Sequence, residues 1–578
     1  MGAFFLCRRH AGDDNAPARA RETLARQGFE RIDDLSTGRF SILYCSKQGA
    51  DSSNVYRRDR DNFCFTVGTL IYGQQTGVEA SRALFEDLAG KSLDRDALYG
   101  NFAIIHCRHG IVHLYTDPQG VYNVWHDTAR QVFSSSFPVM FELAARLSVD
   151  PIAVYQQVFQ EATFGGRTLF NEIARMKVGT AYVLDDACST TTSLGSEEAP
   201  DTRDELDFHV QRMHHRLSRQ FEAIAACFGA HIDSALSGGY DSRLLLALCR
   251  EQQVTPHLHV YGKDSSPDVQ VAKRLCQGEG ITLSHEDKSA YPAVTPEQFP
   301  DIVRNNFYAF QGNCADGILD NGSDLDTRRS RTRGGRLLLN GGGGEVMRNF
   351  FYLPDRSYRV QELLWSFYSR FDPAVTTSRF SERAYYDSLA RSIREQTGIE
   401  SGRLDRHSVE YLYAGFRCTY WMGQNNAINN QFGWFLTPFV DQYIARPAHD
   451  IPISLKNHGR FQGALINTIS PALANYPSDY GHNFQGPVPL KRRLKDWTTL
   501  ARPPLLRKYT YRLKKQSRQH WPYYLQDSFV KQILPHGFDY MQAFFQLQKI
   551  TDAEQFKRIC TIEYLLQHTG ASLERAQH

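Results

Sequence analysis

The sequence lacks any run of 18 or more apolar residues, so we expect no membrane-spanning helix. Its apolar opening, residues 1–6, is too short for a secretory signal. The 11 cysteines include no Cys-x-x-Cys pair, which excludes a zinc ribbon and favours reduced thiols. Neither sign of charge dominates, because 66 Lys and Arg face 63 Asp and Glu, so no whole-chain attraction to nucleic acid is expected. Together these absences predict a cytoplasmic protein without a nucleic-acid partner.

What the chain does have is an ordinary globular composition. Of its 578 residues, 42% are hydrophobic and 22% are charged, and the length is enough for several domains. Residues 1–145 mix turns with short β-prone stretches, such as 63–67 and 102–106, and residues 79–98 have helical spacing. We therefore predict an α+β domain with an antiparallel sheet. Residues 186–204 turn polar and predict a linker or an exposed excursion.

Beyond that segment, strands and helices alternate. A helical pattern over 204–228 precedes two apolar, β-prone stretches, 232–236 and 257–261, and each of these is followed by a helical pattern. Alternation at this spacing predicts a parallel sheet covered on both faces. From about residue 360 the pattern is mainly helical and rich in aromatic residues.

The strongest chemical signal is the segment SGGYDS, which begins at Ser237 between a predicted strand and a predicted helix. Gly238 and Gly239 permit a tight turn whose backbone N–H groups can hold phosphate oxygens at the helix N-terminus. Ser242, like Ser237, can add a hydroxyl donor, and Asp241 can hold a Mg²⁺ ion that bridges phosphates. No lysine follows as in the GxxxxGK[ST] loop, so that class of site is excluded. The alternative is an ordinary strand-to-helix turn without a ligand.

This segment resembles the SGGxDS pyrophosphate loop of the asparagine synthetase family, whose members cleave ATP between the α- and β-phosphates. Further stretches follow in the family's order. Tyr261 and Gly262 end the next strand, where the resemblance places the contact with adenine. Residues 266–285 are similar to the family's SPD…A…LG…H run.

A second glycine loop, LNGGGGE at residues 339–345, also follows a predicted strand and resembles the family's LSGEGSDE turn. The resemblance implies that Asn340 and Gly341 contact the nucleotide. It also implies that Glu345 is the second magnesium carboxylate, beside Asp241. A flexible glycine-rich loop without a ligand is the alternative.

The N-terminal part resembles the family's amidotransferase domain over the stretches 99–103, 115–120 and 133–136. The fold class implied is α/β: an Ntn-hydrolase-like α+β sandwich, followed by a PP-loop parallel-sheet domain with a helical C-terminal part. The domains implied are a degenerate glutamine amidotransferase-like domain at 1–185, an asparagine synthetase-like ATP pyrophosphatase domain at 205–490, and a basic helical extension at 491–578.

Three positions depart from the family where catalysis is concerned. Glutamine-dependent members need a cysteine directly after the initiator Met, whereas position 2 is Gly2 and the first cysteine is Cys7, so we predict no glutaminase activity. Trp434 stands where the family has the Glu of its acyl-transfer site. For the family's later catalytic Lys, the nearest candidate is Arg460, which can neutralise pyrophosphate but cannot act as an acid or base near neutral pH. A plain surface cation is the alternative for Arg460.

Residues 491–518 concentrate positive charge, with Asp496 as the lone acid and with Trp497, Tyr509 and Tyr511 among the cations. Basic and aromatic residues together suit an acidic polymer, a membrane surface or a peptide. A solvated helical face is the commoner explanation.

The resemblance predicts an ATP-dependent carbon–nitrogen ligase with ATP and Mg²⁺ as cofactors. It would adenylate a small-molecule or peptide carboxylate and transfer the acyl group to an amine or ammonia. Without a glutaminase, the organisation is most similar to β-lactam synthetases and lasso-peptide macrocyclases. Amide-forming relatives in polysaccharide or natural-product pathways are an equal alternative. The protein could also bind a protein partner or form a homodimer. The rival hypothesis is a catalytically reduced nucleotide-binding or scaffold protein. A sulfur-transferring tRNA enzyme is disfavoured, because it usually needs paired cysteines.

Overall fold

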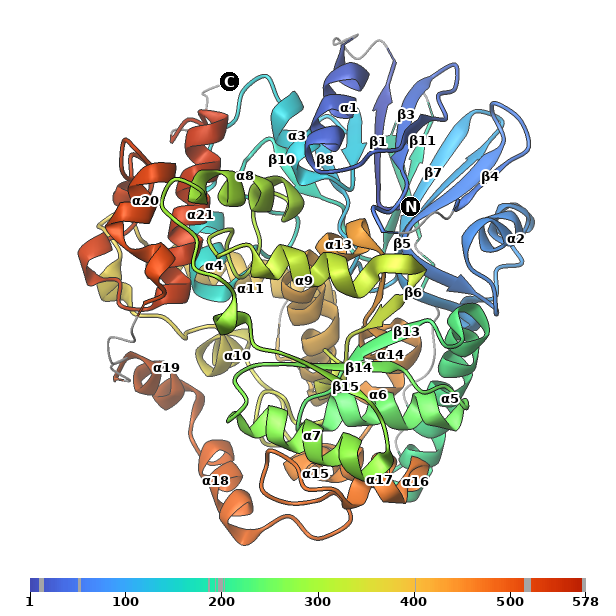
Figure 1. The fold of residues 1–578 in the computed structure, drawn as a ribbon, viewed down its shortest axis with the longest axis vertical. Helices are drawn as coiled ribbons and strands as arrows, with labels where there is room; N and C mark the ends of the chain where they lie inside the picture. The colour runs from blue at the N-terminus through green and yellow to red at the C-terminus, as the bar shows by residue number, and fades with distance from the viewer. Residues whose placement is uncertain are drawn as a thin grey trace.

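A computed structural model describes residues 1–9, 15–49, 53–185, 188–192, 194–195, 201, 203–400, 402–513 and 521–573. Within these ranges the strands form two antiparallel sheets and one parallel sheet (Figure 1). The antiparallel sheets belong to the N-terminal part of the chain, and the parallel sheet belongs to the middle. The predicted fold class, an α+β sandwich followed by a parallel-sheet α/β part, is confirmed.

The two antiparallel sheets have six strands each. The first has the order β10-β8-β9-β1-β3-β2, and the second has the order β12-β11-β7-β6-β5-β4. The strands of the first are β1 (Ala3–Arg8), β2 (Ile32–Asp34), β3 (Phe40–Cys45), β8 (Trp125–Asp127), β9 (Val132–Ser134) and β10 (Ile173–Arg175). Those of the second are β4 (Val55–Arg57), β5 (Phe63–Tyr72), β6 (Leu98–Arg108), β7 (Ile111–Thr116), β11 (Thr180–Leu184) and β12 (Cys188–Thr192).

Strand β1 shows why these strands are apolar along their whole length. Alternate side chains of a strand point to opposite faces of the sheet. Phe4 and Leu6 pack into the core between the two sheets, where Phe65 of β5 also lies, whereas Phe5 and Cys7 pack under helix α1 (Ala16–Arg26). Helix α2 (Gly77–Gly90) covers the outer face of the second sheet in the same way. Both faces of each sheet are therefore buried.

The parallel sheet has the order β15-β14-β13-β16-β17. Its strands are β13 (Ile232–Ala235), β14 (His257–Tyr261), β15 (Leu283–Glu286), β16 (Leu337–Leu339) and β17 (Trp434–Leu436). The helices that follow the first two strands are α6 (Tyr240–Glu251) and α7 (Pro267–Glu279), and α5 (Leu206–Phe228) precedes β13. From β13 the chain moves to one side through β14 and β15, and it then returns to the other side of β13 with β16. The direction of winding therefore switches between β13 and β16.

Some boundaries differ from the sequence prediction. The helix expected over 79–98 ends at Gly90, because Lys91 adopts the left-handed conformation (φ 56°) and caps it, and β6 already begins at Leu98. The polar segment 186–204 is not only a linker, since β12 pairs with β11 at the edge of the second sheet. Residues 186, 187, 193, 196–200 and 202 of that segment lie outside the described residues.

The C-terminal part is helical, as the sequence predicts. Helices α18 (Leu490–Leu500) and α19 (Pro504–Leu513) lie at the edge of the molecule, whereas α21 (Ala553–Thr569) packs against α4 (Pro151–Gln160) (Figure 1). The cations at 514, 515 and 518 lie outside the described residues. In the part of the chain that the structure describes, we find no helix that is long and apolar enough to cross a membrane.

Candidate functional site

The SGGYDS segment forms the turn between β13 and α6, as predicted. Side chains of the segment itself and of Asp268 accept hydrogen bonds from its backbone. The N–H of Ser237 donates to Ser242 Oγ (3.0 Å), and the N–H of Gly239 donates weakly to Ser237 Oγ (3.4 Å). The N–H of Gly238 donates to Asp268 Oδ1 (2.8 Å) in the first turn of α7. Phosphate oxygens would have to replace these partners to use the N–H groups of the turn.

The second glycine loop packs directly on the first. A Cβ atom on Gly341 would meet backbone atoms of Asp241 and Ser242 at 3.2 Å. A Cβ atom on Gly344 would lie 2.5 Å from Asp241 Cγ and still closer to Oδ1. The loop needs glycine at these places because its backbone lies against the carboxylate of the other loop. The two loops that the sequence singled out therefore meet.

Asp241 and Glu345, which the sequence predicts as metal ligands, converge on one point. Arg348 Nη2 occupies it, 2.8 Å from Asp241 Oδ2 and 3.2 Å from Glu345 Oε1. Gln462 Nε2 donates to Asp241 Oδ1 (2.7 Å), and Tyr413 Oη donates to Glu345 Oε2 (2.6 Å). Two carboxylates from different loops thus share one cationic group, and each has a further donor.

Burial makes this site sensitive to protons. It raises the pKa of Asp241 from 3.8 to about 6, against the opposing effect of Arg348, and the nearby charge of Glu345 adds to the rise. Burial also raises the pKa of Tyr413 well above its ordinary value, so Tyr413 stays protonated and donates to Glu345. Tyr413 begins a π-helical segment, Tyr413–Met422, a rare geometry that is frequent at functional sites.

A cavity of about 220 Å³ opens at the carboxyl ends of the parallel strands. Ala235 at the end of β13 and Leu339 at the end of β16 line it, so it lies at the point where the winding of the sheet switches. Ligands of open α/β sheets bind in this crevice. Tyr261 and Asn340, both predicted nucleotide contacts, also line the cavity. Gly262 follows Tyr261 with a φ of 130°, which favours glycine.

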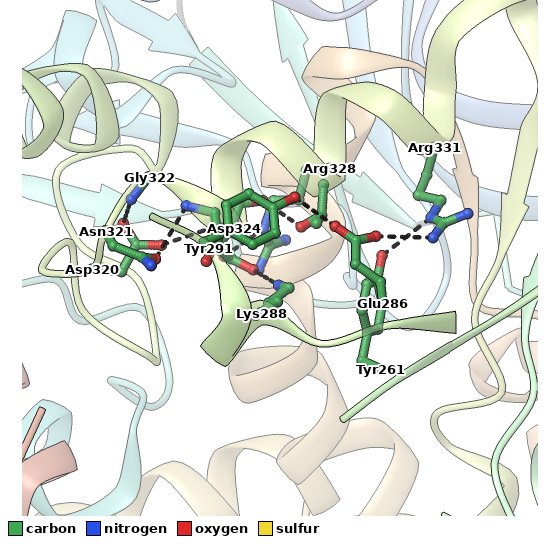
Figure 2. A network of polar contacts seen from close by, with 12 residues as sticks. Tyr261, Glu286, Lys288, Tyr291, Asp320, Asn321, Gly322, Asp324, Arg328 and Arg331 are labelled. Atoms are coloured by element: carbon green, nitrogen blue, oxygen red, sulfur yellow. Dashed lines mark hydrogen bonds and ion pairs between the residues drawn. The ribbon is translucent and has the colours of Figure 1, made fainter. Parts of the chain in front are cut away.

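A charged network forms one wall of this cavity (Figure 2). Arg331 pairs with Glu286 (3.1 Å) and donates to Tyr261 Oη (3.3 Å). Asp324 pairs with both Lys288 (2.7 Å) and Arg328 (2.9 Å). A larger cavity of about 670 Å³ adjoins the first and shares Lys288 and Asp324 with it. The crevice and the larger cavity together offer room for a nucleotide and a second reactant.

Arg460 does not join the site as predicted for a catalytic group. It begins α16 (Arg460–Ile469), is exposed, and lines a separate cavity of about 530 Å³. The contact with Asp241 comes instead from the buried Gln462, two residues later. Trp434 lies buried in β17, with Lys47 Nζ 5.0 Å from its ring centre, so no carboxylate acts at that position.

Sequence reasoning missed Arg348, Gln462 and Tyr413. Arg348 carried a weak signal, since it lies three residues after Glu345 and next to a glycine turn. Nothing in the local sequence distinguishes Gln462 or Tyr413 from other residues of helical segments.

The space around Gly2, where the sequence predicts that a nucleophilic cysteine is missing, is filled. A Cβ atom on Gly2 would lie 2.7 Å from Phe29 Cε1 and 3.2 Å from the carbonyl oxygens of Ser46 and Gln431. Phe29 is itself buried. A cysteine side chain at position 2 would therefore clash with its surroundings.

The fold and the site define an α/β protein with a glycine-loop crevice at the switch point of a parallel sheet. No protein-family model and no curated protein matches the chain. Solved structures give weak matches. One is a glutamine phosphoribosylpyrophosphate amidotransferase from B. subtilis complexed with ADP and GMP, with 10% identity and a TM-score of 0.24 over 49% of this chain and 90% of that one. Another is an allosteric regulatory enzyme of purine biosynthesis, with 10% identity and a TM-score of 0.23 over 59% and 74%.

A third match is a glutamine-dependent NAD⁺ synthetase from Acinetobacter baumannii in complex with ADP. It has 16% identity and a TM-score of 0.18 over 34% of this chain and 41% of that one. Matches at these TM-scores carry no argument about activity. The assignment of fold class rests on the order and direction of the strands in this chain.

Proposed function

We propose that this protein is an ATP-dependent ligase of the asparagine synthetase type, which adenylates a carboxylate and transfers the acyl group to an amine. The observation that carries the proposal is the convergence of Asp241 and Glu345. The two come from glycine loops that pack on each other, and Asn340 of the second loop lines the crevice at the switch point of the sheet. Paired carboxylates at that place suit a bound triphosphate, because they can hold its counter-ion.

The reaction would proceed in two displacements. A carboxylate oxygen of the substrate attacks the α-phosphorus of ATP, the bond from that phosphorus to the bridging oxygen breaks, and pyrophosphate leaves. The amine nitrogen then attacks the acyl carbon, AMP leaves, and the amine gives up a proton. In this scheme Tyr261 and Asn340 orient the nucleotide in the crevice, and Arg348 neutralises charge on the leaving pyrophosphate.

The donor set fits magnesium. Two carboxylate oxygens already face one point, and oxygen ligands are those that Mg²⁺ prefers. In the described residues, no group of three or more His, Cys, Asp or Glu side chains gathers as a metal site, so Asp241 and Glu345 would hold the ion together with phosphate oxygens. When bound, magnesium neutralises phosphate charge. Arg348 would then turn its guanidinium toward the phosphates.

The amine would not come from glutamine hydrolysis within this chain, because the side-chain space at Gly2 is filled. Free ammonia or an amine of the substrate itself is the remaining source. The second alternative matches the organisation of β-lactam synthetases and lasso-peptide macrocyclases. The N-terminal sandwich would then serve as a structural or partner-binding part.

The test is the formation of AMP and pyrophosphate from ATP and magnesium, in the presence of a metabolite and peptide extract from the source cells. Asp241→Asn removes the shared charge, and Asp207→Asn, at an exposed position of α5, is the matched control. We expect AMP with the wild type and with Asp207→Asn, only when extract is present. Unchanged AMP formation by Asp241→Asn would refute the assigned role of Asp241.

A nucleotide-binding scaffold protein is the second candidate function. Two observations favour it, because both occupy groups that catalysis would need. Arg348 lies between the two carboxylates, and Asp268 accepts the hydrogen bond from the N–H of Gly238. This candidate predicts ATP binding without AMP formation under every condition of the same assay.

A further inference from the structure

The large apolar and aromatic side chains that are exposed in the described part of the chain gather on two consecutive helices, α18 and α19. Their exposed fractions run from 44% at Leu505 to 79% at Leu490. The set is Leu490, Leu494, Trp497, Leu505, Leu506 and Tyr509. Contiguous exposed apolar surface marks a site of interaction with a protein or a membrane.

Helix α18 has the opposite orientation to an ordinary surface helix: its apolar stripe faces solvent, whereas the apolar stripe of an ordinary surface helix faces the core. Leu490, Leu494 and Trp497 follow the helical spacing i, i+4, i+7 and share the outer face. The inner face carries Asp496, which is 4% exposed, and Arg492, whose Nε lies 3.3 Å from Asp496 Oδ1. The helix therefore packs on the body through charges and presents its apolar side outward.

Polar contacts fix both helices in this orientation. His458 Nδ1 lies 2.8 Å from Asp496 Oδ2, which ties α18 to the segment before α16. Arg507 of α19 donates to the carbonyl oxygens of Phe351 (2.9 Å) and Thr499 (2.8 Å). A rotation that buried the leucines would break these buried polar contacts, which is costly.

Cations border the apolar stripe of α18. Lys491 and Lys495 lie on one side of it and Arg493 on the other, and all three are exposed. Asp496 is the only acidic residue between positions 490 and 513, and it faces inward. The surface is thus strongly positive in a chain whose net charge is only +3.

We infer that the outer face of α18 and α19 docks on an anionic lipid bilayer. An apolar stripe of Leu and Trp flanked by Lys and Arg is the composition of helices that lie in the membrane interface. The charge is complementary to anionic headgroups. Both helices lie at the edge of the molecule (Figure 1). This inference goes beyond the proposed ligase function and does not depend on it.

The experiment is flotation of the full-length protein with vesicles of POPC alone and of POPC with 30% POPG. The double variant Leu494→Glu/Trp497→Glu removes the apolar stripe, and Lys491→Gln/Lys495→Gln removes two bordering cations. The control, Arg60→Gln/Lys177→Gln, removes two exposed cations of the N-terminal sandwich. Thermal unfolding verifies that each variant is folded, since all six side chains are exposed.

We expect the wild type to bind POPG vesicles and to release them at high salt. The cation variant should bind about 25-fold more weakly, at about fivefold for each charge. The apolar variant should bind at least about tenfold more weakly. The control should match the wild type, and Trp497 fluorescence should shift to the blue on binding. Equal binding by all variants, or none by the wild type, would overturn the inference. A dimer that Leu494→Glu/Trp497→Glu dissociates, without vesicle binding, would assign the surface to a second copy and also overturn it.

Discussion

Replacement of Gly344 by alanine tests whether the two glycine loops form one site. The new Cβ would lie 2.5 Å from Asp241 Cγ, whereas ordinary contacts are 3.4 Å or longer. The φ of Gly344 lies outside the left-handed region, so alanine is compatible with the backbone and the clash alone decides the outcome. The Asp241 carboxylate must move by about 1 Å, which breaks its hydrogen bonds with Gln462 (2.7 Å) and Arg348 (2.8 Å).

The magnitude follows from those two bonds. A hydrogen bond to a charged group contributes about 1.5–3 kcal/mol, so we expect Gly344→Ala, which loses two of them, to lose ~3–6 kcal/mol of stability. Urea unfolding measures this loss, and calorimetry should show that ATP binds at least about tenfold more weakly. Gly38→Ala is the control, because a Cβ there meets nothing within 4 Å. If Gly344→Ala behaves like Gly38→Ala in both assays, the reasoning about the joined loops is wrong.

Three more predictions follow from the geometry. Gly2→Cys should destabilise the fold by ~1–3 kcal/mol through the clash with Phe29 and should release no glutamate from glutamine; any release above the wild-type level contradicts the closed site. Because burial raises the pKa of Asp241 to about 6, its carboxylate takes up a proton as the pH falls through 6. Magnesium-dependent ATP binding, measured by calorimetry between pH 5 and 8, should therefore weaken about tenfold for each pH unit below 6. A flat pH profile would refute this. In thermal unfolding, Tyr413→Phe should cost ~1.5–3 kcal/mol of stability, because it removes the hydrogen-bond donor to Glu345. The control is Tyr368→Phe, which should cost less than about 0.5 kcal/mol, because the buried hydroxyl of Tyr368 has no partner among the described residues. Equal losses would show that the bond from Tyr413 to Glu345 does not contribute to stability.

The sequence predicted those parts of the fold that depend on neighbouring residues. Apolar stretches followed by Gly238 and Gly239 predicted the strand, the turn and the helix, and β14 has the predicted bounds, 257–261. Such signals are local, because a strand needs its own apolar side chains and a tight turn needs its own glycines. The resemblance to the asparagine synthetase family also implied that Asp241 and Glu345, one from each glycine loop, lie together.

Local sequence signals could not predict which side chains contact the carboxylates of Asp241 and Glu345. Arg348 is 107 positions from Asp241, and Gln462 is 221 positions away. Only the packing of α16 and of the second loop brings these side chains to Asp241. For the same reason Arg460, which sequence order favoured, lies exposed, whereas Gln462 makes the contact.

The basic helical extension shows the same difference between what the sequence and what the tertiary structure determine. The sequence by itself predicted that residues 491–518 belong to a helical extension, are basic, and carry aromatic residues among the cations. It did not determine which face of α18 would be buried, because an amphipathic helix can present either side. The tertiary structure decided this through the pairing of Asp496 with Arg492 and His458, which holds the charged face inward and leaves Leu494 and Trp497 in solvent.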